Sequence, residues 1–100
     1  MLPLAARDVY EEILAHINKL GGSYSAWYCG ITSNWVNCLV IEHKVPKEGH
    51  PYIARQCYTS DDATSVENAL LELGCDGAPG RRDKTSVYVY AYLKGTMTKP

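Results

Sequence analysis

In three stretches of the chain, mainly apolar side chains recur at the helical spacing of three and four positions. The first, 9–20, ends at two consecutive glycines. The second follows possible cap residues at 33–34, and the third follows cap residues at 59–62. Thr64 and Glu67 have the spacing of a capping box in the third helix. The positions that define the three predicted helices are Val9, Ile13, Leu14, Ile17 and Leu20, then Val36, Leu39, Val40 and His43, then Val66, Ala69, Leu70 and Leu73.

Segments rich in branched and aromatic residues predict strands at 25–32, 52–58 and 87–93. In the last segment aliphatic residues alternate with Tyr88, Tyr90 and Tyr92, so one face is aliphatic and the other phenolic. Helices and strands therefore alternate in the order αβαβαβ. This order predicts an α/β fold with a small three-stranded sheet flanked by helices, in a single domain over 1–100. A parallel Rossmann-like sheet is the alternative, but its glycine fingerprint is missing.

Composition narrows the class of protein. The 100 residues are 46% hydrophobic and 21% charged, with a formal net charge of −1, as is typical of a soluble globular protein. No apolar run is long enough for a membrane span, and no signal-peptide pattern occurs. We therefore expect a cytoplasmic protein with four reduced cysteines. A zinc site from Cys38, His43 and His50 is a remote alternative, because no Cys-x-x-Cys pair is present.

Charge is unevenly distributed along the chain. Acidic side chains outnumber basic ones as far as Ala78, and the balance reverses with Arg81, Arg82 and Lys84. These three residues are candidates for contacts with a nucleic-acid phosphate backbone. A solvated loop is the alternative interpretation of the same charges.

A block of consecutive residues suggests a family. Residues 27–34 read Trp-Tyr-Cys-Gly-Ile-Thr-Ser-Asn and lead into a predicted helix that ends near His43. This block resembles the Tyr-Ile-Gly half of the GIY-YIG nuclease superfamily motif, with Cys29 for the middle isoleucine. Residues 66–71 resemble the family's helix with the metal-binding glutamate, here Glu67. Together the similar segments, 27–43 and 52–74, cover about half the chain.

The resemblance implies an endonuclease that hydrolyses phosphodiester bonds of nucleic acid, with DNA the expected substrate. Glu67 would hold one Mg²⁺ or another divalent cation, while water and phosphate oxygens fill the other positions. Tyr28, or a tyrosine of the last strand, would help to activate water, and His43 would transfer a proton or contact the phosphate.

The sequence departs from the family at the helix arginines, whose positions hold Asn37 and Cys38. Neither replacement supplies a positive charge toward the scissile phosphate. Arg55, on the neighbouring strand, is the candidate substitute.

The sequence also departs from the family in its first strand, because no Gly-Ile-Tyr strand precedes Tyr28. Either Tyr24 is its remnant, or the strand at 87–93 fills its place, as in a circular permutation. We favour the second arrangement because 87–93 has the length and alternation of a central strand. Tyr88, Tyr90 or Tyr92 would then be the family's first tyrosine, and we select Tyr90.

Two functions remain open at this point. One is an endonuclease that lacks the usual arginine. The other is a catalytically degenerate module on the same fold. Such a module would bind nucleic acid through Arg81, Arg82 and Lys84, or bind a protein, a second copy included, through its tyrosine-rich face.

Overall fold

The last strand of the chain lies in the centre of a three-stranded antiparallel sheet. The computed structural model describes residues 1–78 and 83–100. The strands are β1 (Trp27–Thr32), β2 (Tyr52–Gln56) and β3 (Tyr88–Leu93). Their order in the sheet is β1–β3–β2, and Tyr90 lies opposite Gly30 on one side and Ala54 on the other. The predicted pairing of the last strand with the Tyr28 strand is confirmed, and the parallel alternative is wrong.

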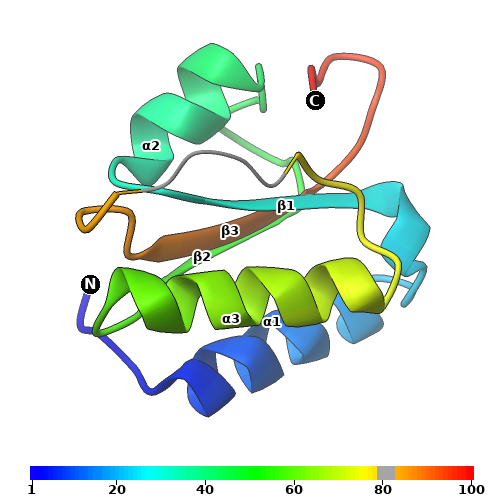
Figure 1. The fold of residues 1–100 in the computed structure, drawn as a ribbon. Coiled ribbons are helices and arrows are strands. Elements are labelled where there is room, and N and C mark those ends of the chain that lie inside the picture. The colour runs from blue at the N-terminus through cyan, green and yellow to red at the C-terminus, as the bar shows by residue number, and fades with distance from the viewer. Residues whose placement is uncertain (79–82) are drawn as a thin grey trace.

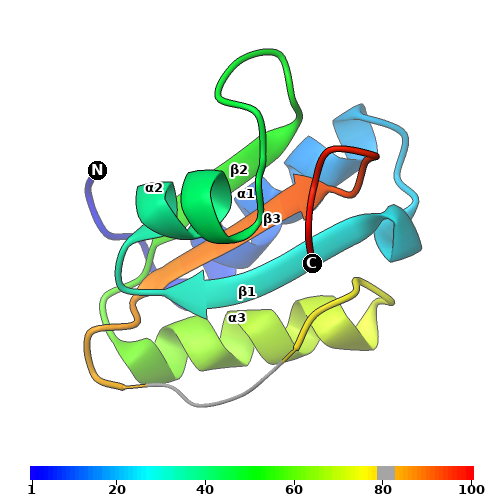
Figure 2. The same cartoon turned by 90° about the horizontal axis from the view of Figure 1, so that it is seen from above.

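Helices cover both faces of this sheet (Figure 1). On one face lie α1 (Ala6–Lys19) and α3 (Ser60–Glu72), and on the other lies α2 (Trp35–Asn37), which continues as a π-helical turn, η2 (Cys38–Glu42). A 3-10 turn, η1 (Tyr24–Ala26), leads into β1. Viewed from above, the C-terminal segment crosses the α2 side of the sheet (Figure 2). No helix in the described part of the chain is long and apolar enough to cross a membrane.

The alternation along β3 divides its side chains between two cores. Val89 and Ala91 pack with α1 and α3 in the larger core, whereas Tyr90 and Tyr92 pack on the α2 side. The predicted aliphatic and phenolic faces of this strand are therefore confirmed. In α1 the buried positions follow the predicted stripe, except that Leu20 lies past the end of the helix and is exposed.

The second helix differs from its predicted pattern. The N–H of His43 donates to the carbonyl of Cys38 at 3.0 Å, a bond across five residues that widens the turn. Cys38 and Leu39 are both buried as a result, while Val36 is 51% exposed. The prediction that Val36 shares the buried face is therefore wrong, because a regular helical period does not hold across a π turn.

The start of α3 confirms the predicted cap within 59–62 but not the predicted capping box. Thr59 is the cap, and its Oγ1 accepts a hydrogen bond from the N–H of Asp62 at 3.1 Å. Thr64 lies inside the helix, where its hydroxyl donates to the carbonyl of Ser60. The capping box of Thr64 and Glu67 is therefore wrong, and Glu67 lies mid-helix on the buried side.

Candidate functional site

Three tyrosines and one histidine meet on the α2 side of the sheet. Tyr28 comes from β1, Tyr90 and Tyr92 come from β3, and His43 follows η2; we call these four residues the tyrosine–histidine cluster. The ring of Tyr28 lies 4.9 Å from that of His43 and 5.4 Å from that of Tyr92, measured between centroids. The sheet order thus brings together three residues singled out in the sequence, Tyr28, His43 and Tyr90.

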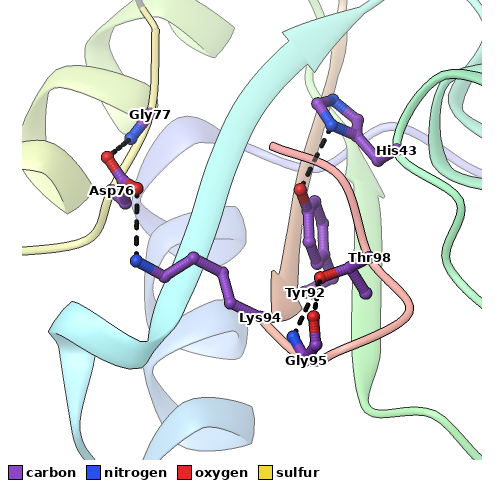
Figure 3. A network of polar contacts seen from close by, with 7 residues as sticks. All are labelled: His43, Asp76, Gly77, Tyr92, Lys94, Gly95 and Thr98. Atoms are coloured by element: carbon purple, nitrogen blue, oxygen red, sulfur yellow. Dashed lines mark hydrogen bonds and ion pairs between the residues drawn. The ribbon is translucent and has the colours of Figure 1, made fainter.

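Both ring nitrogens of His43 have hydrogen-bond partners. Nδ1 lies 2.8 Å from the carbonyl oxygen of Lys99, and Nε2 lies 2.9 Å from the hydroxyl of Tyr90. A carbonyl can only accept, so Nδ1 donates to Lys99, while Nε2 pairs with the Tyr90 hydroxyl. The hydroxyl of Tyr92 lies 3.1 Å from Nδ1 (Figure 3). The imidazole is therefore held in one orientation.

Hydrogen bonds extend from Tyr90 to the second helix. The thiol of Cys38 bonds the Tyr90 hydroxyl and also Thr32. Burial raises the pKa of Tyr90, and it raises the pKa values of Tyr28 and Tyr92 as well. All three phenols are therefore neutral near physiological pH. They can donate hydrogen bonds, but phenolate is not available there as a base.

Gly30 allows β1 to pass directly against the Tyr90 ring. A Cβ atom at this position would lie 2.5 Å from the Tyr90 hydroxyl oxygen and 2.7 Å from the ring carbon that bears it. Real Cβ atoms do not approach so closely. The glycine of the Tyr-Cys-Gly block is thus required by the packing of the tyrosine–histidine cluster.

The C-terminal segment closes the cluster on its outer side. The N–H of Lys99 donates to the carbonyl of His43 at 2.6 Å, in addition to the bond that the Lys99 carbonyl accepts. Gly95 and Thr98 close a tight turn in the same segment, with a bond of 2.8 Å (Figure 3). Tyr28 is only 8% exposed and His43 only 9%. Both rings are therefore largely closed to solvent in this structure.

Glu67 lies on α3, which covers the opposite face of the sheet, and is 6% exposed. Its charge contributes to the raised pKa values of Tyr28 and Cys29, after larger effects of burial and nearer groups. Mg²⁺ bound by a single carboxylate needs room for waters and phosphate oxygens. Over residues 1–78 and 83–100 no three side chains of ligand type are grouped to hold a metal. The buried Glu67 therefore does not fit the expected Mg²⁺, and the zinc alternative at Cys38 is wrong.

Arg55 does not take the place of the missing arginine. Its Nε lies 2.6 Å from Oε1 of Glu12 on α1, and its Nη1 donates to the carbonyl of Ala54 at 2.8 Å. Arg7 also belongs to α1 and lies 4.0 Å from its neighbour Glu11. Both arginines of the described residues thus interact on the α1 side, away from the tyrosine–histidine cluster.

The two residues at the family's arginine positions face different surroundings. Asn37 is exposed and donates a hydrogen bond to Glu42 at 3.3 Å. Cys38 is buried and contacts the tyrosine–histidine cluster, so it is the position from which a side chain could face the cluster.

Of the three basic candidates for phosphate contacts, Lys84 alone belongs to the described residues. Lys84 is exposed in the turn before β3, whereas Arg81 and Arg82 lie outside the described residues. Lys94 is paired with Asp76 at 3.2 Å (Figure 3). Asp76 belongs to the segment that bonds along the outer edge of β1, where the N–H of Cys29 donates to its carbonyl at 2.8 Å.

We compared the chain with known proteins at the levels of sequence and fold. It matches no family model, no curated protein and no solved structure. The resemblance in residues 27–43 and 52–74 therefore rests on the residues themselves.

An apolar cavity beside the tyrosine–histidine cluster was not predicted from the sequence. It has a volume of about 340 Å³ and lies between the second helix and β2. The rings of Trp35 and Tyr52 are nearly parallel there, with 25° between their planes and 6.1 Å between their centroids. Leu39 and Val45 belong both to its wall and to the core around the cluster. No spacing rule links positions 35 and 52, so only the fold reveals this pair.

Proposed function

We propose that this protein is a nucleic-acid-binding domain with a GIY-YIG-like arrangement that has lost the catalytic apparatus of the family. One observation carries the proposal. Tyr28, His43 and Tyr90 lie together, as the resemblance expects, but no arginine of the described residues reaches them, and the carboxylate of Glu67 is buried.

The sheet order supports the family likeness. A strand in the middle of the sheet borders both β1 and β2, and β3 occupies that place. This is the arrangement expected if the last strand fills the vacant slot of the Gly-Ile-Tyr strand. Tyr90 of β3 then lies opposite Gly30 of the Tyr-Cys-Gly block. The resemblance and the topology therefore agree on a permuted order of strands.

The chemistry of the site favours binding over hydrolysis. Phosphodiester cleavage develops negative charge that fixed cations must stabilise. The tyrosine–histidine cluster supplies neutral phenols and a hydrogen-bonded imidazole instead, and the C-terminal segment bonds to that imidazole. In this state the cluster ties β1, β3 and η2 together beneath a binding surface.

Phosphodiester hydrolysis is the second candidate, and the hydrogen bond between Tyr90 and His43 favours it. An imidazole oriented through Nδ1 presents Nε2 as a proton acceptor, as a general base requires. Tyr90 would have to release that nitrogen to an attacking water. The proposed hydrolysis includes no step through a metal, because the residues present do not fit one.

Binding and cleavage can be measured with the same labelled nucleic acids. We expect fluorescence anisotropy to show binding of single-stranded or duplex DNA or RNA that weakens as salt rises, because phosphate contacts release counterions. We expect no cleavage in Mg²⁺ or Mn²⁺. A protein that binds neither DNA nor RNA at low salt would contradict the proposal.

Three proteins separate the two candidates: the wild type, Asn37→Arg, and Asn37→Arg combined with Glu67→Gln. Because Asn37 is exposed beside Glu42, we expect its arginine to pair there and restore no cleavage. Cleavage by the wild type or by Asn37→Arg would establish the endonuclease, and its loss in a folded Glu67→Gln protein would show that Glu67 takes part in it despite its burial.

A further inference from the structure

The cavity beside Trp35 and Tyr52 has the features of a small binding site. It is walled mainly by apolar side chains, and its volume of about 340 Å³ falls in the range of small-molecule pockets. Trp35, Val36, Lys47 and Tyr52 belong to its lining. We propose that this cavity binds an unpaired nucleobase stacked on the Trp35–Tyr52 pair, with Lys47 beside the phosphate; this rests on the proposed nucleic-acid binding.

The aromatic pair suits a flat ligand. Its rings are inclined by only 25°, and Tyr52 is 37% exposed, so one aromatic surface remains open to solvent. Every base has a π face, and proteins that bind single strands use such aromatic surfaces without needing a particular sequence. A base in a duplex is stacked on both sides, so the site selects unpaired bases.

A cation lies at the mouth of the cavity. Lys47 is exposed and belongs to the lining, so its ammonium can contact a phosphate attached to the bound nucleoside. Val36 is also exposed, at 51%, and forms part of the apolar wall. An ammonium next to an aromatic and aliphatic wall complements a nucleotide, which combines a flat ring with an anion.

A second cavity continues the same surface around β2. Its volume is about 330 Å³, and Trp35 and Tyr52 line it together with His16 and Arg55. The aromatic pair is therefore shared by two cavities, one lined also by Lys47 and the other by Arg55, whose guanidinium is paired with Glu12. A single strand that crosses β2 at the aromatic pair meets the exposed charge of Lys47 on one side of its stacked base.

The two tryptophans allow a direct measurement. Trp27 is 1% exposed on the opposite face of the sheet, so a ligand in the cavity acts on the fluorescence of Trp35 alone. We expect saturable quenching by short oligodeoxythymidine and by thymidine monophosphate, and much weaker quenching by a blunt duplex. Anisotropy of the same oligonucleotide with a fluorescein label gives the overall affinity independently.

Matched variants test the location. Val36→Asp places a charge in the cavity wall, whereas Ile41→Asp alters a residue that is 58% exposed on the same helical segment but does not line the cavity. We expect Val36→Asp to weaken oligonucleotide binding about tenfold, as loss of one stacked base does, and Ile41→Asp to leave it unchanged. Likewise, Lys47→Gln should weaken binding more than Lys44→Gln, which alters a lysine outside the lining.

Three outcomes would show that the cavity does not bind a base. Oligonucleotide binding without quenching of Trp35, and equal in Val36→Asp and Ile41→Asp, would overturn the base site but leave the proposed function in place. No binding of any nucleic acid at low salt would overturn both. Self-association seen by analytical ultracentrifugation and abolished by Val36→Asp would make the surface an interface between copies of this chain.

Discussion

His43 and Tyr90 are joined by a hydrogen bond of 2.9 Å although 47 positions separate them in the chain. The bond links the end of the second helix to the central strand. The same imidazole also contacts Lys99 through Nδ1. One side chain thus connects three segments that are distant in the sequence, so its removal should destabilise the packing of all three.

Tyr90→Phe should lower the free energy of unfolding by about 1–3 kcal/mol, because it leaves Nε2 of His43 buried without a donor. Urea denaturation measures the change. Tyr88→Phe is the matched control on the same strand face, and it should cost less because Tyr88 is less buried. Equal losses in the two variants would show that the bond to His43 does not stabilise the fold.

Gly30→Ala should destabilise the protein by about 1–3 kcal/mol through overpacking, because the added Cβ would collide with the Tyr90 hydroxyl. The same substitution in a Tyr90→Ala background should cost clearly less. A double-mutant cycle of urea midpoints tests this coupling. Additive effects would mean that Gly30 is required for some reason other than the Tyr90 ring.

Protonation of His16 should oppose folding. Burial lowers the pKa of His16, and the charges of Arg55 and Lys19 lower it further. The unfolded chain then binds the proton first, near the ordinary histidine value of about 6.5. Stability contributed by neutral His16 is therefore present above that pH and lost as the pH falls toward the lower pKa of the folded state.

Titration of the imidazole resonances by NMR should give His16 a pKa below its ordinary value. The urea midpoint of His16→Gln should fall less than that of the wild type between about pH 7 and about pH 5. An unshifted His16, or parallel stability curves for the two proteins, would contradict this account.

The four cysteines should react slowly in the folded protein, since all are buried. Burial raises the pKa of Cys57 to about 11, with a smaller contribution from Asp62, so little reactive thiolate is present. Cys75 should be the first to react, because a hydrogen bond from Cys29 lowers its pKa. Timed alkylation followed by peptide mass spectrometry gives the order, and full reactivity should appear in urea. Modification of Cys57 before Cys75 would contradict this predicted order.

The features that the sequence predicted are those encoded by neighbouring residues. The alternation in 87–93 assigns tyrosines and aliphatic residues of β3 to opposite faces, and the stripe in α1 identifies Val9, Ile13 and Ile17 as core. These patterns depend on local geometry alone, so they can be read without a partner segment.

The features that the sequence did not predict depend on contacts between distant segments. The π turn begins at Cys38, which is buried against Tyr90 of β3 and Thr32 of β1, residues far from it in the sequence or on another element. Arg55 was a candidate for the site because of its charge, but β2 directs it to Glu12. The resemblance identified Tyr28 and His43, whereas the Trp35–Tyr52 cavity has no signature in the chain.

The place of β3 in the sheet has a consequence for synthesis on the ribosome. β1 and β2 are not neighbours; of the three strands that the structure describes, β3 lies between the other two and is made last of the three. A nascent chain that ends before residue 88 therefore lacks the strand that joins β1 to β2, and its helices have no complete sheet to cover. Since contacts of large sequence separation form late and slowly, we expect folding to begin only after β3 has left the exit tunnel. Until then the apolar faces of α1 and α3 have no complete sheet to pack against.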